Sequence, residues 1–400
     1  MNKSVISWVL YDVANTVFNL GVLGLFLPLW INQRQGTTDA DLGFPVAMAM
    51  IVVLVLSPFL GAFTDQSRGP VQTFTVLNIL AAAATFIFGF VSSISVNLVI
   101  FGAAFVCVYL AELLYNAMLT DASTPQNRGK VGGLGIGLGN LGSLALILFA
   151  LQYEGINSDY ALAFRIIALI FLLAALPITF FFVRKPITTP RSESLSFMST
   201  WDQLKKTRAY FKQHPNLPRF FVARYFYMIA VTTASTFAVL YGINTVGFTE
   251  RQMELVMLLG ILVAMPSAVL WGYLVDKAGP RYALKWDLFG WVLILAGSVS
   301  IPLMHLNNQL WWPLSVVTGL CFGGLWVADR PLLIQLSPAN LGQMFGFYGM
   351  VSRLAFLTGA FLWPLISVTI GLGQPAAVLF LLCCALLGFI LLVKVRDPQL

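Results

Sequence analysis

The segment GYLVDKAGPR, residues 272–281, and the segment GAFTDQSRG, residues 61–69, share a pattern that organises the whole chain. Each follows a long apolar stretch and places an aspartate four positions after its first glycine. The two segments begin 211 positions apart. A second related pair, TPQNRGKVGGLG from Thr124 and SPANLGQMFGFYG from Ser337, begins 213 positions apart. Two recurrences at nearly one offset indicate two similar halves.

The composition indicates an integral membrane protein. Of the 400 residues, 58% are hydrophobic and 10% are charged, whereas a soluble domain has about 45–50% apolar and 25% charged residues. An apolar run of about 20 residues can cross the roughly 30 Å hydrocarbon core as a helix. We predict twelve such spans: 6–32, 43–63, 71–92, 96–119, 131–152, 160–183, 219–243, 252–275, 283–303, 310–332, 342–368 and 374–394.

The longest polar connection divides these spans six and six. We therefore expect an all-α membrane protein with twelve transmembrane helices in two pseudo-symmetric six-helix halves, residues 1–183 and 219–400, joined by a linker at 184–218. Within the linker, WDQLKKTRAYF at 201–211 suits a short amphipathic helix on the cytoplasmic membrane surface. A solvated linker helix is the alternative.

Lysine and arginine gather on one side of the predicted spans, which predicts that both termini are cytoplasmic. The net charge of +7 then reflects topology and contact with anionic membrane lipid, and it gives no reason to expect nucleic-acid binding. The outer connections hold only Arg34, Arg251 and, at a helix end, Arg165. The inner connections and termini hold Arg68, Arg128, Lys130, Arg184, Lys185, Arg191, Lys205, Lys206, Arg208, Lys212, Arg219, Lys277, Arg281, Lys285, Lys394 and Arg396.

With twelve spans, the pattern Gly-x-x-x-Asp-Lys-x-Gly-x-Arg at 272–281 resembles the major facilitator superfamily. The first-half copy departs from it at Gln66 and Ser67. Three further segments resemble the branch that includes vacuolar amino-acid exporters linked to autophagy and their bacterial relatives: WVLYDVANTVFN at 8–19, LLYNAMLTDASTPQNRGKVGGLGIGLGNLG at 113–142 and FGFYGMVSRLAFLTG at 345–359. The resemblance implies a monomeric transporter, with the inner membrane of a bacterium as its expected location.

The repeated glycine and aspartate pattern also suggests a gate. A glycine lets two helices approach closely, and an aspartate can accept hydrogen bonds at the N-terminus of a facing helix while basic residues pair across the loop. Simple loop capping is the alternative interpretation. We predict a cytoplasmic gate formed by Asp65, Arg68, Asp276, Lys277 and Arg281.

Polar side chains interrupt the first and fourth predicted spans. Asp12, Asn15 and Asn19 share one helical face, and a polar face at membrane depth must meet a cavity or a polar partner. The resemblance implies that both spans line a central cavity. We predict substrate contacts from Asn15, Asn19, Tyr115 and Asn116, and a coupling proton on Glu112 or Asp12. A desolvated carboxyl group holds its proton more readily, and a nearby cation reverses that preference.

The second half supplies cations. Arg353 lies about halfway along the eleventh predicted span, where an unpaired charge is costly. Arg224 lies 212 positions after Asp12, inside the seventh span. We predict that Arg224, Arg330 and Arg353 bind substrate, with structural pairing of Asp329 to Arg224 or Arg330 as the alternative. Asp287 and Arg165 lie near helix ends and are expected to be interfacial.

The sequence contains no pattern typical of a catalytic or cofactor-binding site. Neither histidine has a neighbour at ligand spacing, and all four cysteines lie in apolar spans, so we expect no metal site, no disulfide and no cofactor. The glycines of GGLGIGLGNLGS, from Gly132, follow no strand and precede no Lys-Ser/Thr pair, so they are not a nucleotide loop. They suit either a sliding helix contact or static close packing. We expect a protein that is not an enzyme.

These features predict a secondary active transporter that works by alternating access. The cations of the second half and the carboxylates of the first suit a small anionic or zwitterionic solute, such as an amino acid or peptide, moved with protons. The alternatives are a lipid or lysolipid flippase of the same fold, a multidrug efflux transporter, and a receptor without transport.

Overall fold

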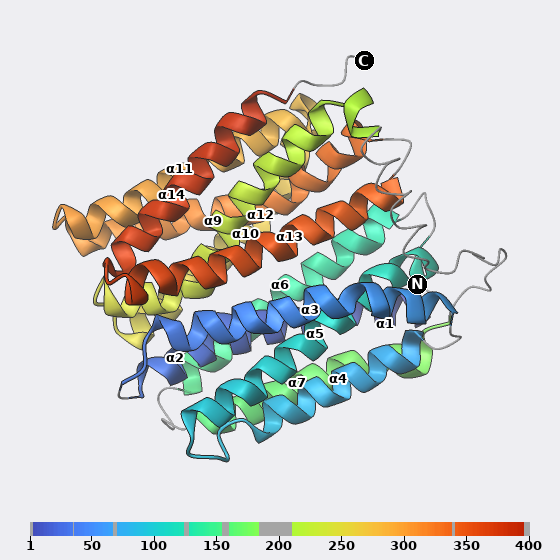
Figure 1. Cartoon of the computed structure of the whole chain (residues 1–400), viewed down its shortest axis with the longest axis horizontal. Coiled ribbons are helices and arrows are strands. Elements are labelled where there is room, and N and C mark those ends of the chain that lie inside the picture. Colours follow the sequence, from blue (N-terminus) through green and yellow to red (C-terminus); the bar gives the residue numbers. More distant parts are fainter. Residues whose placement is uncertain are drawn as a thin grey trace. The chain divides into compact units, whose positions relative to one another are not determined.

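The computed structural model describes residues 3–34, 36–66, 70–123, 128–153, 160–183, 210–337 and 341–395. Almost all of them are helical (Figure 1). The chain divides into two compact units, Met1–Arg191 and Ser192–Leu400, and the division falls inside the predicted linker.

The first unit contains the elements of the first six predicted spans. Its first span is continuous through a widened π-helical stretch, η1, which lies between α1 and α2. The bounds are α1 Lys3–Thr16, η1 Val17–Phe26, α2 Leu27–Asn32, α3 Asp39–Gln66, α4 Pro70–Ile87, α5 Ile94–Ala122, α6 Arg128–Tyr153 and α7 Tyr160–Phe181.

The second unit contains the elements of the other six. The bounds are α9 Asn216–Asn244, α10 Glu250–Ala278, α11 Pro280–Leu303, η2 Asn308–Leu310, α12 Trp311–Leu336, α13 Leu341–Pro364, η3 Leu365–Thr369 and α14 Gly373–Val393. Each predicted span thus coincides with a helix, and the all-α membrane fold class is confirmed. In the described part of the chain, ten helices are long and apolar enough to cross a membrane, and Val71–Ile87 and Gly137–Gln152 are shorter apolar helices.

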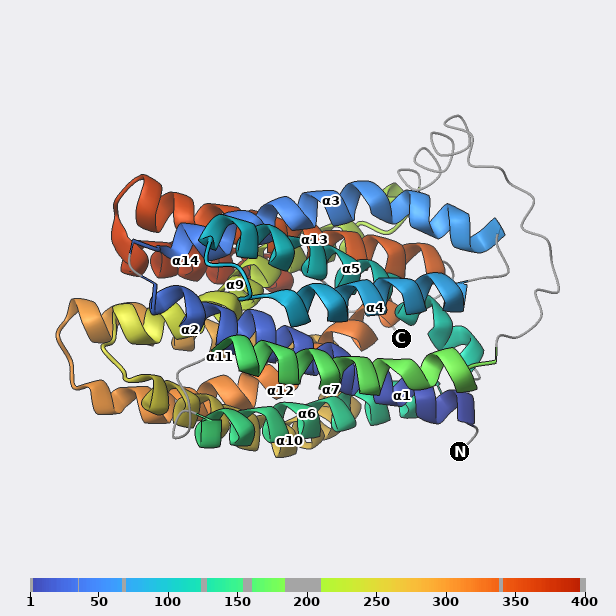
Figure 2. The same cartoon turned by 90° about the horizontal axis from the view of Figure 1, so that it is seen from below.

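The same pairs of helices pack together in the two units. In the first unit, α1 packs on α6 and α7, α4 packs on α5 and α7, and α3 packs on α5. In the second unit, α9 packs on α13 and α14, α11 packs on α12 and α14, and α10 packs on α12. Figures 1 and 2 show α4 running beside α7. Each unit therefore repeats one arrangement of six membrane segments, as the offset motifs predict.

The motif at 272–281 forms the tight connection between α10 and α11. Gly279 has a φ of 88°, a conformation that side-chain-bearing residues rarely adopt, so α10 can end and α11 can begin there. Pro280 follows at the first position of α11, where its missing N–H breaks no helical hydrogen bond. Gly279, the second glycine of the motif, thus permits the tight turn between the two helices.

The predicted linker lies mostly outside the described residues, which resume at Tyr210. Phe211 packs on Phe221 of α9 and Phe347 of α13, with ring centroids 6.0 and 5.5 Å away. The end of the predicted amphipathic segment is therefore attached to the second unit by aromatic packing.

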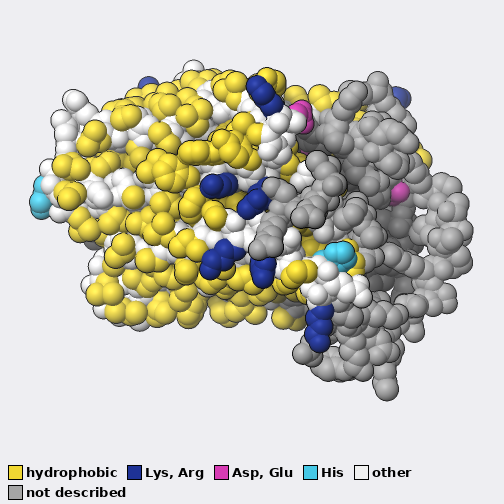
Figure 3. Space-filling view, turned by 90° about the horizontal axis from the view of Figure 1, so that it is seen from above, with side chains coloured by type: hydrophobic (Ala, Val, Ile, Leu, Met, Phe, Trp, Pro, Cys, Tyr) yellow, Lys and Arg dark blue, Asp and Glu magenta, His cyan; other side chains and the backbone are white. Residues whose placement is uncertain are grey.

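Hydrophobic side chains cover most of the described surface in Figure 3. Large apolar residues such as Val269 and Leu173 are 74% and 70% exposed. A water-soluble protein rarely exposes such extensive apolar surface, whereas a lipid-facing surface requires it. The chain is an integral membrane protein.

Candidate functional site

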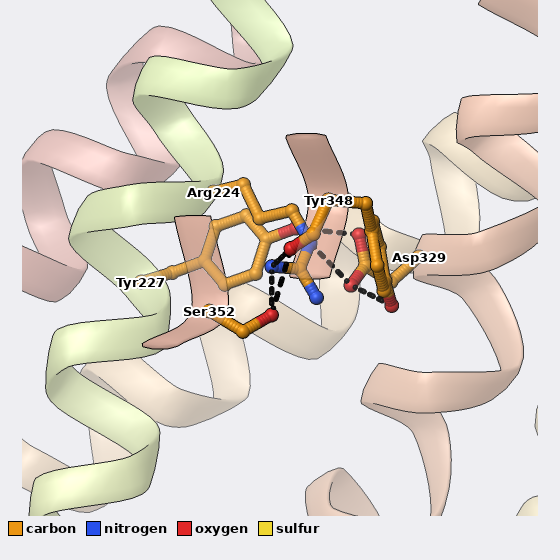
Figure 4. A network of polar contacts seen from close by, with 5 residues as sticks. All are labelled: Arg224, Tyr227, Asp329, Tyr348 and Ser352. Atoms are coloured by element: carbon orange, nitrogen blue, oxygen red, sulfur yellow. Dashed lines mark hydrogen bonds and ion pairs between the residues drawn. The ribbon is translucent and has the colours of Figure 1, made fainter. Parts of the chain in front are cut away.

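A polar network in the second unit is centred on Arg224 and Asp329 (Figure 4). Both side chains have 0% exposure, and Arg224 Nε donates to Asp329 Oδ2 at 3.1 Å. Arg224 Nη1 also donates to Ser352 Oγ at 2.7 Å and to the Tyr348 carbonyl oxygen at 3.2 Å. The pair therefore joins α9, α12 and α13.

Two tyrosines complete the shell of the carboxylate. Tyr227 donates its hydroxyl to Asp329 Oδ1 at 2.6 Å, and Tyr348 donates to Oδ2 at 2.8 Å. The Tyr348 ring also lies beneath the guanidinium, 3.4 Å from its centroid to Arg224 Cζ. Removing two charges from solvent is costly, and these hydrogen bonds and the cation–π contact offset much of that cost.

The network lies at one depth in the second unit. Arg224 is eight residues from the start of α9, Asp329 is seven from the end of α12, and Tyr348 is seven from the start of α13. At about 1.5 Å of rise per residue, these positions are about 10–12 Å along their helices. Three residues from helices far apart in the sequence therefore lie at a similar depth and form one polar layer.

The second-half cations therefore occupy different environments. Asp329 pairs with Arg224 rather than with Arg330, which is exposed at the next position of α12. Arg353, halfway along α13, is half-buried. Arg224 has no exposed surface in this conformation, so a direct contact with a solute would require the network to open. Its role in substrate binding stays a prediction.

In the first unit, Asp12 lies against the glycine face of α6. A side chain at Gly135 would overlap the Asp12 carboxylate and would come within 3.3 Å of the Trp8 ring. A side chain at Gly139 would come within 2.7 Å of Thr16 Oγ1. These glycines therefore serve the close packing of α1 and α6 inside one unit.

The aromatic residues beside Asp12 form a closely packed cluster. Tyr115 stacks on Trp8 with ring centroids 4.4 Å apart and lies 4.7 Å from the Tyr11 ring. Trp8 Nε1 donates to the Tyr115 carbonyl oxygen at 3.1 Å, and Tyr11 donates to Asn78 Oδ1 at 3.1 Å. Tyr115, predicted to bind substrate, is only 3% exposed, so it packs as a core residue here.

Asn15 and Asn19, which were predicted to contact substrate, lie together with one polar residue of the fourth span. Asn19 donates to Asn15 Oδ1 at 2.9 Å, and Tyr109 of α5 donates to Asn19 Oδ1 at 3.1 Å. Asn19 lies in η1, where the widened helix turn alters the direction of its side chain relative to a regular α-helix. Glu112, three residues after Tyr109, is half-buried, and Asn116 is exposed. Polar residues of the first and fourth predicted spans are therefore in hydrogen-bond contact.

The predicted gate residues are only partly described. Asp276 and Lys277 are exposed at the end of α10. Arg281 donates from Nη2 to the Val393 carbonyl oxygen of α14 at 2.9 Å, which caps the end of that helix. The side chain of Asp65 and the whole of Arg68 lie outside the described residues.

Asp287 corrects an interpretation made from the sequence. It was expected at the interface because it lies near the start of a span, but it is buried with 0% exposure. Its helix begins at Pro280 and places it on the side facing α12, against Gly324. The spacing of small residues on α11 and α12 could have suggested this seam, although no pattern in the sequence identified its partner.

The described residues include no group of three or more His, Cys, Asp or Glu side chains that could hold a metal ion. All four cysteines are free thiols. The arrangement holds a buried ion pair within a network of hydrogen bonds.

Comparison with known proteins supplies a family match. The sequence model of the Major Facilitator Superfamily matches residues 14–360. The uncharacterized MFS-type transporter YxiO of Bacillus subtilis strain 168 is 25% identical over 96% of this chain and 94% of its own. An uncharacterized protein of Aquifex aeolicus strain VF5 is 21% identical over 98% and 96%.

Two solved structures share the fold. A mutant of the nucleoside transporter NupG has a TM-score of 0.73 at 13% identity and covers 99% of this chain and 100% of its own. A D-xylose–proton symporter has a TM-score of 0.70 at 14% identity and covers 99% and 97%. At these identities the likeness concerns the fold.

Proposed function

Because the chain belongs to the major facilitator superfamily, we propose that it is a proton-coupled secondary transporter that moves a small anionic or zwitterionic solute by alternating access. The chain is a membrane transporter of this superfamily and is not an enzyme. We propose its substrate class, its coupling ion and its kinship with amino-acid exporters.

One observation carries the substrate class: Arg353 places a cation halfway along a membrane helix and is not fully buried. An arginine at this depth is costly unless it meets a polar partner, water or a ligand. Its planar fork suits a carboxylate or phosphate group. Arg330, exposed on α12, is a second cation for the same class of solute. An amino acid or small peptide supplies the required carboxylate.

Glu112 is the proposed coupling carboxyl of the first unit. It is half-buried on α5 and lies close to the tyrosines of the α1–α5 cluster. A carboxyl group in such a position can bind a proton in a closed state and release it where water or a cation approaches. Asp12 is the second candidate, while Asn15, Asn19 and Asn116 are proposed to contact the solute.

We also propose an orientation of the chain in the membrane and a gate on its cytoplasmic side. The lysine and arginine distribution favours two cytoplasmic termini in a bacterial inner membrane. Asp276 and Lys277, exposed at the end of α10, are proposed to pair with another segment when the cytoplasmic side closes. The protein acts as a monomer in this proposal.

Ligand binding to Arg353 variants tests the substrate class. A thermal-shift screen of amino acids, peptides, phosphates, sugars and lysolipids should find a carboxylate-bearing solute that raises the melting temperature of the purified protein. Arg353→Ala should abolish that shift, and Arg353→Lys should retain part of it, because lysine keeps the charge but loses the planar fork. An unchanged shift in Arg353→Ala would show that the arginine is structural, and a shift with lysolipids alone would favour the flippase.

Transport by a Glu112 variant tests the coupling. In proteoliposomes, Glu112→Gln should preserve solute exchange and eliminate accumulation driven by a pH gradient, because the amide resembles the protonated acid and cannot titrate. Asp12→Asn is the matched comparison. If Glu112→Gln still concentrates the solute, the coupling proton is bound elsewhere.

A further inference from the structure

One carboxyl group of the second unit is enclosed without a hydrogen-bond donor. Asp287 has 0% exposure, and neither of its carboxylate oxygens has a partner among the described residues. It is seven residues from the start of α11, about 10 Å along the helix. This depth matches that of Asp329 and Arg224, so the carboxyl group belongs to the same polar layer.

The carboxylate is sealed in the seam between α11 and α12. It lies against Gly324, where any added side chain would overlap it. Trp271 of α10 covers the same glycine, but its indole N–H donates to the Leu320 carbonyl oxygen at 2.8 Å and is not available to the carboxylate.

One turn further along α11, Gly290 allows a similarly close approach, since a side chain there would overlap Cys321 Sγ of α12. Small residues on both helices thus hold the seam closed around Asp287. A longer side chain at Gly324 or at Gly290 would clash with the facing helix.

No cation among the described neighbours compensates the group. On α12, Cys321 and Asp329 interact with it electrostatically, whereas Arg330, the residue after Asp329, is exposed. The titratable residues of α14 are Cys383 and Cys384. The charged residues of α10 lie at its ends, namely Glu250, Arg251 and Glu254 at one and Asp276 and Lys277 at the other. On α11 itself, Lys285 is exposed and Arg281 caps α14.

An ionised carboxylate in this position would lack every interaction that normally stabilises a buried charge. It would also place a second anion near Asp329, which is already paired with Arg224. The neutral acid avoids both costs. We propose that Asp287 is a proton-binding site of the second unit, occupied in this conformation, and that loss of its proton weakens the Arg224–Asp329 network.

This site is separate from the coupling carboxyls Glu112 and Asp12, which belong to the other unit. It gives the second unit its own means of sensing protons, because the charge of one enclosed carboxyl group acts on the ion pair that joins α9, α12 and α13. Proton binding at Asp287 does not depend on which solute the protein carries.

Infrared spectroscopy of the purified full chain tests the protonation directly. The difference spectrum between wild type and Asp287→Asn at neutral pH should contain the carbonyl band of a protonated carboxyl group. The matched control Asp276→Asn changes an exposed aspartate on the neighbouring helix α10. This variant should keep the band, so its difference spectrum against wild type should not contain it. A difference spectrum that contains only ionised carboxylate bands would overturn the proposal.

The pH dependence of the melting temperature tests the link to the ion pair. The folded protein holds a proton that the unfolded chain releases, so its stability should fall as the pH rises. Asp287→Asn should remove part of this dependence, whereas Asp276→Asn should retain it. Equal pH dependence in wild type and Asp287→Asn would overturn the link. If Asp287→Asn does not fold, the infrared spectrum of wild-type protein with 13C-labelled aspartate is measured instead. The absence of a protonated aspartate band in that spectrum would overturn the proposal.

Discussion

The first helices of the two units, α1 and α9, have equivalent neighbours but opposite charges at one equivalent position. Asp12 and Arg224 lie 212 positions apart, and each faces the fifth membrane segment of its own unit. Asp12 lies on Gly135, whereas Arg224 lies on Tyr348, which stands 213 positions after Gly135. A glycine in one unit thus occupies the place of a tyrosine in the other.

The difference shows that the repeat preserves helix packing more strongly than side-chain chemistry. A short carboxylate needs only the space that Gly135 leaves. A long guanidinium at the equivalent place needs an aromatic face and an anion, which Tyr348 and Asp329 supply. Two similar folds can therefore carry an aspartate packed on a glycine in one unit and a buried ion pair at the equivalent place in the other.

The largest effect is expected from removing the anion of the second unit. Asp329→Ala should lower the free energy of unfolding by about 3–5 kcal/mol, because it leaves Arg224 buried without its counter-ion. Asp276→Ala removes an exposed aspartate and should change it by less than about 0.5 kcal/mol. Chemical unfolding of the purified protein in detergent measures both.

The double variant Arg224→Met/Asp329→Leu should recover much of the loss, since apolar residues of similar volume need no compensation for buried charge. If Asp329→Ala proves as stable as Asp276→Ala, the second unit does not depend on its buried ion pair for stability.

A moderate effect is expected from filling the acidic position of the first unit. Gly135→Leu should lower the free energy of unfolding by about 1–3 kcal/mol, because the new side chain must displace Asp12 and Trp8. Gly137→Leu, two residues along α6, adds the same side chain to open space and is the control. Equal unfolding transitions for the two variants would show that α6 does not depend on close contact with α1 at this point.

The smallest effect is a difference, about 1 kcal/mol, between removing one tyrosine hydroxyl from the second unit and removing one from the first. Tyr348→Phe removes a hydrogen bond to a carboxylate and should cost about 1.5–3 kcal/mol, whereas Tyr109→Phe removes one to the amide of Asn19 and should cost about 0.5–1.5 kcal/mol. The same unfolding measurement gives the difference. A larger loss from Tyr109→Phe would contradict the view that the second unit holds the more tightly bound polar network.

Sequence reasoning located the polar residues but not their partners. Arg224 and Asp329 are 105 positions apart, and the spacing left Arg224 and Arg330 equally available to Asp329. The choice depends on which faces of α9 and α12 meet. The same limit explains Asp287, since its distance from the start of a predicted span says nothing about the side of the helix on which it lies.

The sequence by itself determined the membrane class, the twelve segments and the internal repeat. Lipid imposes these features locally, because each crossing needs about 20 apolar residues with their backbone hydrogen bonds satisfied within one helix. The family resemblance at 272–281 follows from short motifs of the same local kind.

Only the tertiary structure decided which charges are enclosed. Arg224 forms a buried ion pair, Tyr115 is a core residue, and Asp287 has no hydrogen-bond donor in the part of the chain that the structure describes, because each environment is assembled from helices distant in sequence. Burial and pairing are properties of helix faces in contact, and the energies of charges in an apolar interior depend on partners within a few ångströms.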